Sequence, residues 1–485
     1  MILIIDEEIN ESDVMIYMKK DFLWGGSTSA FQFEGGANEG GKGDSIYDVI
    51  SKTGEIQLGE IKIKSNADYS TTSDFYHHYE EDIELMAEMG FNSFRMSIAW
   101  TRIYPNGDDK EYNKEGVDFY NRVFDKLVKH GIKPVVTLFH WDIPQSLVER
   151  FDGWYGVETV DAFERYCETC FKLFGDRVKY WLTLNENNLC KLLPCLHTKT
   201  KLKATDEGYE EFTLRVYHNT NIAHFKAVKL CHELVSDGKI GCMLASSKAY
   251  PMTSHPKDVF EAVKHEQNKM YDYLDLLVMG SYNHREIAEF DNINLNIYKD
   301  DSFKELATNS LSKIDFISFS YYFSICMKSN ESKVNEDAKT LQIMYQAYEN
   351  PMLEKSSFGW TIDPLGLRVL MNDLYDRYSL PLLIVENGLG VEDDVLESDG
   401  TVHDPYRVEY LRQHINAVKD TIEIDNIECF GYLPWGCIDL YSASGNKNKR
   451  YGFIYVDYED NFKRYKKDSF YWYKKVISSN GKELD

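Results

Sequence analysis

Residues 91–140 read FNSFRMSIAWTRIYPNGDDKEYNKEGVDFYNRVFDKLVKHGIKPVVTLFH. Both ends of this stretch, Phe91–Trp100 and Lys133–His140, are apolar runs with residue types that strands favour. Between them, Lys114–Gly131 has apolar residues three to four positions apart with charged residues in between, which is the period of a helix with one buried face. The order strand, helix, strand predicts two parallel strands joined by a crossover helix.

The same alternation runs along the whole chain. Six further apolar runs flank this stretch: Phe22–Gly26, Tyr180–Leu184, Ile240–Ala245, Ile314–Tyr322, Leu380–Val385 and Phe430–Trp435. Other segments of helical period lie between them: Glu158–Phe174, Gly208–Leu234, Pro364–Tyr378 and Pro405–Ile422. Eight strands with intervening helices predict an α/β fold, the closed (β/α)8 or TIM barrel. No linker, internal repeat or low-complexity segment interrupts this order, so we predict a single domain over residues 18–485.

The first residues have the wrong pattern for a signal peptide. The apolar run Met1–Ile5 has no basic residues before it and meets three acidic residues, Asp6–Glu8, at once. Met18 and two lysines come directly before the first strand-like run, so we interpret residues 1–17 as an N-terminal extension outside the fold. No run reaches the roughly 18 apolar residues needed to span a bilayer. These features predict a soluble, cytoplasmic protein without a membrane partner.

The charge balance of the chain excludes one class of partner. The 54 Lys and Arg residues face 79 Asp and Glu residues, which gives a formal net charge of -25. Such a field repels nucleic acid and anionic membranes, so we expect a monomer or a small homo-oligomer with no nucleic-acid partner. An anionic small molecule would need a local cationic pocket.

Nine cysteines are scattered from Cys167 to Cys437 without the tight spacing of a disulfide framework, which favours reduced thiols in a cytosol. The one C-x2-C pair, Cys167 and Cys170, lies in a segment of helical period and has no second pair. We therefore interpret it as core packing rather than a zinc site.

Polar and aromatic residues stand at the predicted strand ends: Gln32, Arg95, His140, Trp141, Asn185, Glu186, Tyr321, Tyr322, Glu386, Asn387 and Trp435. Taken alone, Glu186 could begin a helix, Arg95 could form a structural ion pair, and His140 could be a satisfied buried histidine. Active sites of barrel enzymes, however, are assembled at the carboxyl ends of the strands. Because burying this much polarity at one mouth without a ligand is costly, we predict an active site there.

Two carboxylates from different strands of one barrel are what glycoside hydrolysis requires. The fourth and seventh runs supply Glu186 as acid/base and Glu386 as nucleophile, which in a retaining enzyme lie about 5 to 5.5 Å apart. We expect the negative charge of the nucleophile to raise the pKa of the acid. Arg95 can hold Glu386 ionised, Tyr322 can donate a hydrogen bond to the same carboxylate, and Asn185 can bind the sugar 2-hydroxyl.

Several segments resemble the signature segments of glycoside hydrolase family 1, from about Lys19 to Tyr473. They are Phe22–Gly26, Gln32–Gly35, Phe94–Trp100, Thr137–Pro144, Leu184–Glu186 and Ile384–Gly388. The resemblance implies the (β/α)8 fold, double-displacement hydrolysis with retention, and no metal or organic cofactor. It also implies that the sugar at the cleaved end is bound by Gln32, His140, Asn185 and Trp435. Trp360 would line the aglycone side, and Trp141 stands next to His140 as a further substrate-binding residue.

The segment after Trp435 bears on the substrate class. Ordinary β-glucosidases of this family carry there a Glu-Trp pair whose Glu accepts hydrogen bonds from the sugar 4- and 6-hydroxyls, whereas this chain has Ser442 and Ala443. The change removes a charge that would repel a 6-phosphate. Lys449 and Tyr451 follow with a cation and a phenolic donor, so Ser442, Lys449 and Tyr451 resemble the phosphate site of the family's 6-phospho-β-glycosidases. The alternative is that Lys447, Lys449 and Arg450 form a solvated basic patch on a loop.

The small residue Ala443 favours glucosides over galactosides, because the resembling 6-phospho-β-galactosidases tend to have Trp at that position. The sequence therefore predicts a retaining 6-phospho-β-glucosidase acting on cellobiose 6-phosphate or aryl-β-glucoside 6-phosphates. The alternatives are an unphosphorylated β-glucosidase, a 6-phospho-β-galactosidase, or a non-catalytic sugar-binding protein of the same family. Retention of both Glu186 and Glu386 speaks against the last of these.

The chain departs from the family pattern next to the predicted acid. Asn187 replaces the usual Pro or Ile, and the following stretch up to Asp206 is basic and lacks the common glycine-containing loop. Ser320 stands where many relatives carry Asn. We expect these changes to alter the fit of the aglycone or the position of the acid.

Overall fold

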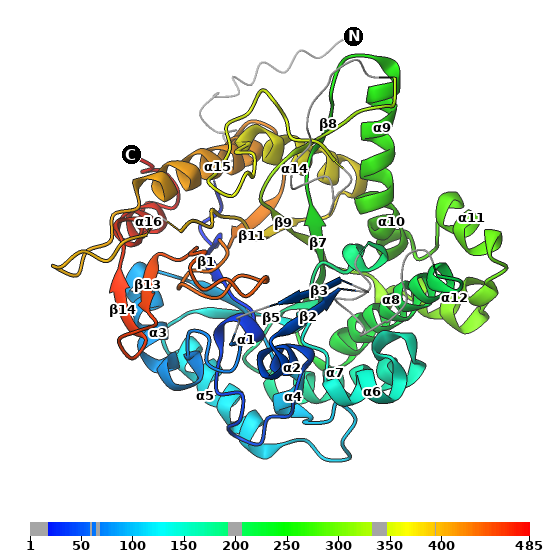
Figure 1. Cartoon of the computed structure of the whole chain (residues 1–485), viewed down its shortest axis with the longest axis horizontal. Coiled ribbons are helices and arrows are strands. Elements are labelled where there is room, and N and C mark those ends of the chain that lie inside the picture. Colours follow the sequence, from blue (N-terminus) through cyan, green and yellow to red (C-terminus); the bar gives the residue numbers. More distant parts are fainter. Residues whose placement is uncertain (1–17, 59–60, 65–67, 193–205, 332–346, 393) are drawn as a thin grey trace, which may run out of the picture.

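The computed structural model describes residues 18–58, 61–64, 68–192, 206–331, 347–392 and 394–485. Eight parallel strands close into one barrel, each paired with its neighbours in chain order, and the last returns to the first (Figure 1). The barrel strands are β1 Leu23–Ser27, β4 Ser93–Ser97, β5 Lys133–Phe139, β6 Tyr180–Leu184, β7 Lys239–Ser246, β9 Phe316–Tyr321, β11 Leu382–Glu386 and β12 Cys429–Tyr432. Every one of them falls within or beside a predicted run, so the prediction of a single-domain (β/α)8 barrel is confirmed. The predicted extension at residues 1–17 lies outside the described residues.

Helices surround the barrel in Figure 1. The longer ones are α3 Phe75–Met89, α5 Lys114–Lys129, α7 Val157–Phe174, α8 Tyr209–Leu234, α9 Pro256–Glu266, α14 Pro364–Tyr378, α15 Pro405–Glu423 and α16 Asp468–Ser478. The shorter ones are α1 Ala30–Phe33, α2 Ile46–Thr53, α4 Trp100–Ile103, α6 Gln145–Phe151, α10 Asp272–Met279, α11 His284–Asn292 and α12 Asp301–Thr308. Within the described residues, none of the helices combines the length and the apolar character needed to cross a membrane.

Local sequence explains where the barrel helices begin. Helix α14 starts at Pro364, whose fixed φ suits the first turn, and the Asp363 side chain accepts a hydrogen bond of 2.8 Å from the backbone N–H of Gly366. Helix α5 begins in the same way after Asn113, whose side chain accepts from the N–H of Glu115. Two of the predicted helical segments therefore begin directly after a cap residue that the sequence contains.

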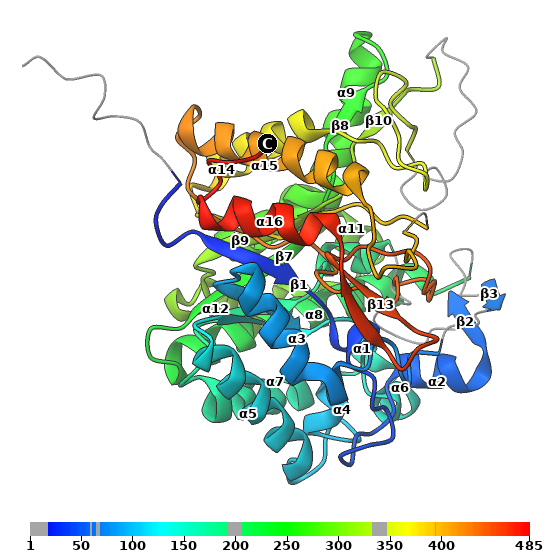
Figure 2. The ribbon, with the colours of Figure 1, turned by 90° about the vertical axis from the view of Figure 1, so that its left-hand side faces the viewer.

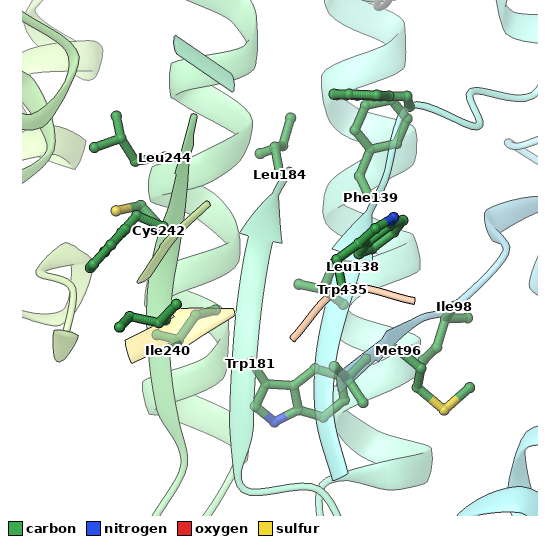
Figure 3. Packing of buried hydrophobic residues seen from close by; sticks show 14 of the residues in the cluster. Met96, Ile98, Leu138, Phe139, Trp181, Leu184, Ile240, Cys242, Leu244 and Trp435 are labelled. Carbon is green, nitrogen blue, oxygen red and sulfur yellow. The ribbon is translucent and has the colours of Figure 1, made fainter. Parts of the chain in front are cut away.

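Two apolar layers hold the barrel together because strand side chains alternate between its faces. One cluster fills the inside and consists of Leu23, Val135, Leu182, Met243, Phe316, Leu383, Val385 and Leu433. Residues at the alternate positions, such as Trp181, Cys242 and Ile384, belong to the larger cluster that also contains the buried helix faces. Figure 3 shows Trp181, Ile240 and Cys242 of this larger cluster on neighbouring strands. Cys167 and Cys170 of α7 are buried in it, which fits the packing interpretation.

Short strands outside the barrel build up the connecting loops. They form three pairs: β2 Glu55–Leu58 with β3 Ile61–Lys64, β8 Ala249–Pro251 with β10 Ile325–Met327, and β13 Ile454–Asp457 with β14 Lys463–Lys466. Strands β2, β3 and β13 lie on the same side of the molecule in Figure 2. The chain between β12 and β13 carries four of the predicted ligand residues, Trp435, Ser442, Lys449 and Tyr451, so it shapes the site rather than the barrel.

Candidate active site

Four polar side chains from different strands meet at the mouth of the barrel. Arg95 of β4 is fully buried and donates through Nη1 to Oε1 of Glu386 at 2.5 Å and through Nη2 to Oδ1 of Asn185 at 2.6 Å. The hydroxyl of Tyr322 donates to the other oxygen of Glu386 at 2.8 Å. Both contacts that the sequence predicted for Glu386 are therefore present, and they fix the orientation of its carboxylate.

Glu186 follows β6 and faces the same mouth. Its backbone has φ 49°, a left-handed conformation that is uncommon for a residue with a side chain and that recurs at functional sites. The hydroxyl of Ser320 donates to Oε1 of Glu186 at 2.6 Å. Ser320, noted in the sequence only as a departure from relatives, thus contacts the predicted acid directly. The two residues are 134 positions apart in the chain, so sequence reasoning did not find this contact.

The two carboxyl groups titrate differently because their neighbours differ. Burial, followed by the charge of Glu386, raises the pKa of Glu186 to about 8, against smaller lowering effects of Ser320 and Arg95. Burial also raises the pKa of Glu386, but the charge of Arg95 and the hydrogen bonds from Arg95 and Tyr322 act in the opposite direction. A cation therefore favours the ionised form at Glu386, while Glu186 keeps its proton at neutral pH. One carboxylic acid and one carboxylate are the pair that glycosyl transfer needs.

An aromatic and amide rim adjoins the carboxylates. His140 stacks against Trp435 with ring centroids 5.6 Å apart, and burial together with Arg95 holds the pKa of His140 well below its usual range. Its imidazole is therefore neutral and can donate or accept a hydrogen bond without carrying charge. The Trp141 indole N–H donates to the Asn185 carbonyl at 3.0 Å, so Trp141 holds the turn before Glu186 and offers a ligand its ring only.

Two predicted sugar-binding amides differ in how far the protein satisfies them. Gln32 of α1 donates to the Tyr441 carbonyl at 2.7 Å and accepts from the Ser29 hydroxyl at 2.8 Å, which fixes its amide plane. Asn185 accepts from Arg95, while its buried Nδ2 has no hydrogen-bond partner in the described part of the chain. A buried donor without a partner is costly, so this amide is suited to a ligand hydroxyl.

The cations after Trp435 have three different environments. Lys447 is exposed and pairs with Glu459 at 2.8 Å, and Arg450 is buried and pairs with Asp439 at 2.7 Å. Lys449 is buried as well, with 8% of its surface exposed, and within the described ranges it forms no ion pair. The alternative of a solvated basic patch is therefore wrong for Lys449 and Arg450, and holds for Lys447 alone.

Aromatic rings replace water around the Lys449 ammonium. Its Nζ lies 3.9 Å from the ring centroid of Trp360, 4.3 Å from that of Phe358 and 5.6 Å from that of Tyr451. Each such contact contributes about 0.5–2 kcal/mol, which offsets part of the cost of burying the charge. Burial lowers the pKa of Lys449 to about 8, against a small raising effect of Glu392.

A glycine in the neighbouring backbone leaves room for the Lys449 side chain. A Cβ atom at Gly390 would lie 2.7 Å from both Cε of Lys449 and Cζ of Tyr451, so only glycine allows both side chains to pack there. Ser442 accepts a hydrogen bond from the Asn446 N–H at 3.1 Å, which closes the loop that carries it. Trp360 also packs against Tyr322, with centroids 5.4 Å apart, so it borders Lys449 as well as the predicted aglycone side.

A buried charge network behind this loop escaped sequence reasoning. Nη1 of Arg407 donates to the Leu389 carbonyl at 2.6 Å and to the Tyr451 carbonyl at 2.9 Å, while Arg407 also pairs with Asp394 and Asp404 at 2.9 Å each. The network ties the chain after β11 to the chain that carries Tyr451. Its members are spread over more than 60 residues, and no local spacing signals them.

The described residues contain no group of three or more His, Cys, Asp and Glu side chains arranged to hold a metal ion. The chemistry that the mouth offers is that of a protonated carboxyl group, an ionised one and oriented hydrogen-bond donors. This set can transfer a proton and form a bond to carbon without further groups.

Comparison with known proteins identifies the family of the chain. A family model described as "Glycosyl hydrolase family 1" matches residues 15–482. The 6-phospho-beta-glucosidase of Clostridium longisporum is 43% identical over 476 residues, which cover 96% of this chain and 98% of that protein. An aryl-phospho-beta-D-glucosidase of Bacillus subtilis (strain 168), BglH, is 44% identical over 473 residues, with 96% and 98% covered. The solved beta-glucosidase of Thermotoga maritima in complex with glucoimidazole superposes with a TM-score of 0.81 at 33% identity, covering 96% of this chain and 99% of that one.

Proposed function

The chain belongs to glycosyl hydrolase family 1, and we propose from its site that it hydrolyses β-glucosides phosphorylated at the 6-position, with retention of configuration. The observation that carries the phosphate preference is Lys449, a buried ammonium surrounded by rings and without an acidic partner in the described residues. Ser442 and Tyr451 on the same loop supply hydroxyl groups. Two relatives with phosphorylated β-glucosides in their names, each covered almost completely, support the proposal.

The first step of the proposed reaction forms a bond to the protein. The ionised Glu386 attacks the anomeric carbon, the bond from that carbon to the glycosidic oxygen breaks, and Glu186 transfers its proton to the departing oxygen. The products of this step are the free aglycone alcohol and a glucosyl ester on Glu386. The raised pKa of Glu186 keeps the proton available at neutral pH, and the charge and hydrogen bond of Arg95 favour the ionised form of the attacking carboxylate against the effect of burial.

The second step restores the enzyme with water. Once Glu386 is esterified its negative charge is gone, so the pKa of Glu186 falls and this group becomes a base. It takes a proton from a water molecule, the water oxygen attacks the anomeric carbon, and the ester bond to Glu386 breaks. Two inversions give net retention, and the reaction consumes no cofactor.

The rim residues act as positioning groups for the sugar in this proposal. The free Nδ2 of Asn185 donates to the 2-hydroxyl, an interaction that strengthens in the transition state. Gln32 and His140 hold other hydroxyls, with Trp435 beneath the ring. Because Arg95 is hydrogen-bonded to both Asn185 and Glu386, the amide that binds the sugar and the attacking carboxylate keep a fixed position relative to each other.

A phosphate dianion fits the pocket around Lys449 for an energetic reason. An unpaired buried cation is costly, and a ligand that supplies the missing negative charge recovers that cost as binding energy. A neutral 6-hydroxyl does not. Sugar phosphates are made and kept inside cells, which supports the proposal that this protein acts in the cytoplasm.

Substrate discrimination is the direct test of the proposal. We expect kcat/KM for p-nitrophenyl β-D-glucoside 6-phosphate to exceed that for p-nitrophenyl β-D-glucoside by about 100-fold, the size of one strong charge-assisted contact. Steady-state assays on the purified protein, with the corresponding galactoside pair, measure it. A ratio near one with good turnover would indicate an ordinary β-glucosidase. A preference for the galactoside phosphate would indicate a 6-phospho-β-galactosidase, and no turnover of any substrate would indicate a sugar-binding protein.

The pH dependence of kcat/KM should distinguish the titration of Glu186 from that of Lys449. Glu186 must be protonated in the first step, so kcat/KM on the unphosphorylated glucoside stays level below about pH 8 and falls tenfold per unit above it. Lys449 is cationic below its pKa of about 8 and loses its charge above it, so the 6-phosphate should show a second tenfold loss per unit. Profiles of kcat/KM between about pH 7 and 10 measure both slopes. Equal slopes on the two substrates would contradict the role of Lys449.

A further inference from the structure

A small cavity of about 40 Å³ adjoins the predicted acid. Glu186 and Tyr322 form part of its lining, whereas the phosphate-pocket residues Ser442, Lys449 and Tyr451 do not. Leu189 and other apolar side chains supply much of the remaining wall. Because Glu186 is the group proposed to protonate the leaving oxygen, the cavity adjoins the leaving-group side in the proposed reaction. Its volume suits a small substituent, since about 10–15 Å³ of such space holds one water molecule.

A second cation without a counterion faces this cavity. The described residues offer the Lys269 ammonium no ion pair and no hydrogen bond, and burial together with the charge of Lys191 lowers the pKa of Lys269. The charge of Glu289 acts in the opposite direction on the pKa of Lys269, but Glu289 is bonded to Lys191 at 2.5 Å. Apart from Glu186, no acidic side chain among the described residues lines the cavity.

A histidine from the same helical segment lines the cavity beside Lys269. His265 stands four residues earlier, so the two side chains lie on one face where α9 passes into the π-helical turn Gln267–Tyr271. Turns of this kind are rare and recur at functional sites. Burial, with a smaller effect of Lys269, lowers the pKa of His265 to about 4, so the imidazole is a neutral hydrogen-bonding group.

Asn188 fixes this turn against the acid. Its Nδ2 donates to the carbonyl of Lys269 at 2.8 Å and to that of Ala245 at 2.9 Å, and its Oδ1 accepts from the Ala245 N–H at 2.9 Å. Because Asn188 stands two residues after Glu186, the distance from Lys269 to the acid is set by hydrogen bonds. The departure from the family pattern at Asn187 and Asn188 thus falls where the leaving group is held.

We propose that Lys269 and His265 form a subsite for a carboxylate carried by an aromatic leaving group. The proposal rests on the proposed function and extends it to the aglycone. A carboxylate has the size of the cavity, its charge supplies the counterion that Lys269 lacks, and His265 can donate to its second oxygen. The aromatic ring that bears it lies against Tyr322 and Phe323, which line the same cavity.

The test compares two leaving groups of nearly equal shape, 3-carboxyphenyl and 3-(methoxycarbonyl)phenyl, on β-D-glucoside 6-phosphate. The quantity measured is the ratio of kcat/KM for the acid to that for the ester, in the wild type and in Lys269→Met, Lys269→Arg and Lys264→Met. We expect the ratio to fall about tenfold in Lys269→Met, the effect of one partly desolvated charge pair, and to persist in Lys269→Arg. Lys264→Met removes a partly exposed lysine of the adjoining helix α9, which is paired with Glu261, and should keep the wild-type ratio.

Comparing ratios between variants cancels the intrinsic difference between the two phenols. An unchanged ratio in Lys269→Met, or an equal fall in Lys264→Met, overturns the subsite. The same pair of leaving groups on unphosphorylated glucoside gives an independent reading. If the phosphate preference itself fails, phosphorylated and unphosphorylated substrates react alike, while the ratio of acid to ester still reports on Lys269.

Discussion

Glu386→Ala is expected to lower kcat/KM by roughly 10⁴-fold on phosphorylated and unphosphorylated aryl glucosides alike, because the covalent intermediate can no longer form. The contacts around Glu386 make this the largest single loss: Arg95 and Tyr322 hold its two oxygens, and no other carboxylate among the described residues bonds to Arg95. Release of p-nitrophenol under saturating and subsaturating substrate measures the effect. Residual activity within tenfold of the wild type would assign the nucleophile to another residue.

Added azide distinguishes a lost nucleophile from a damaged fold. In Glu386→Ala the small anion can enter the vacated space and attack the anomeric carbon, forming a carbon–nitrogen bond while the phenol leaves, which gives the α-glucosyl azide. In Glu186→Ala the glucosyl ester on Glu386 still forms with a good leaving group, and azide then gives the β-product. Proton NMR of the anomeric centre identifies each product. A β-azide from Glu386→Ala would mean that Glu386 is the acid/base and Glu186 the nucleophile.

Lys449→Met is expected to lower kcat/KM for p-nitrophenyl β-D-glucoside 6-phosphate by about 100-fold, mainly through KM, which corresponds to about 2.7 kcal/mol. Methionine keeps the apolar stem against Trp360 and Phe358 but removes the charge, so the loss reports the phosphate contact rather than the packing. The unphosphorylated glucoside should change much less. Initial-rate measurements on both substrates give the two ratios.

Lys447→Met is the matched control for that experiment. It removes a lysine from the same loop that is exposed and paired with Glu459, so both substrates should keep their wild-type constants. A comparable loss in Lys447→Met would restore the interpretation of a general basic patch. Equal losses on the two substrates in Lys449→Met would mean that Lys449 supports the structure and does not recognise phosphate.

The position of the site could be predicted because it depends on local pattern and on one rule of topology. Strand runs and helical periods such as Phe91–Trp100 and Lys114–Gly131 are read from neighbouring residues, and a parallel barrel brings the carboxyl ends of its strands to one mouth. Arg95, Glu186 and Glu386 therefore had to meet once eight strands alternated with helices. The structure contains the Arg95 and Tyr322 contacts to Glu386 as the sequence predicted.

The sequence by itself thus determined the barrel, and it predicted the two carboxylates and the residue types of the proposed phosphate pocket. Only the tertiary structure decided which of Lys447, Lys449 and Arg450 is solvated, paired or buried without a partner. It alone placed Ser320 on the acid and Lys269 in a cavity beside it. The physical reason is that pKa values and charge pairing depend on burial and on neighbours a hundred or more residues away, which no local pattern encodes.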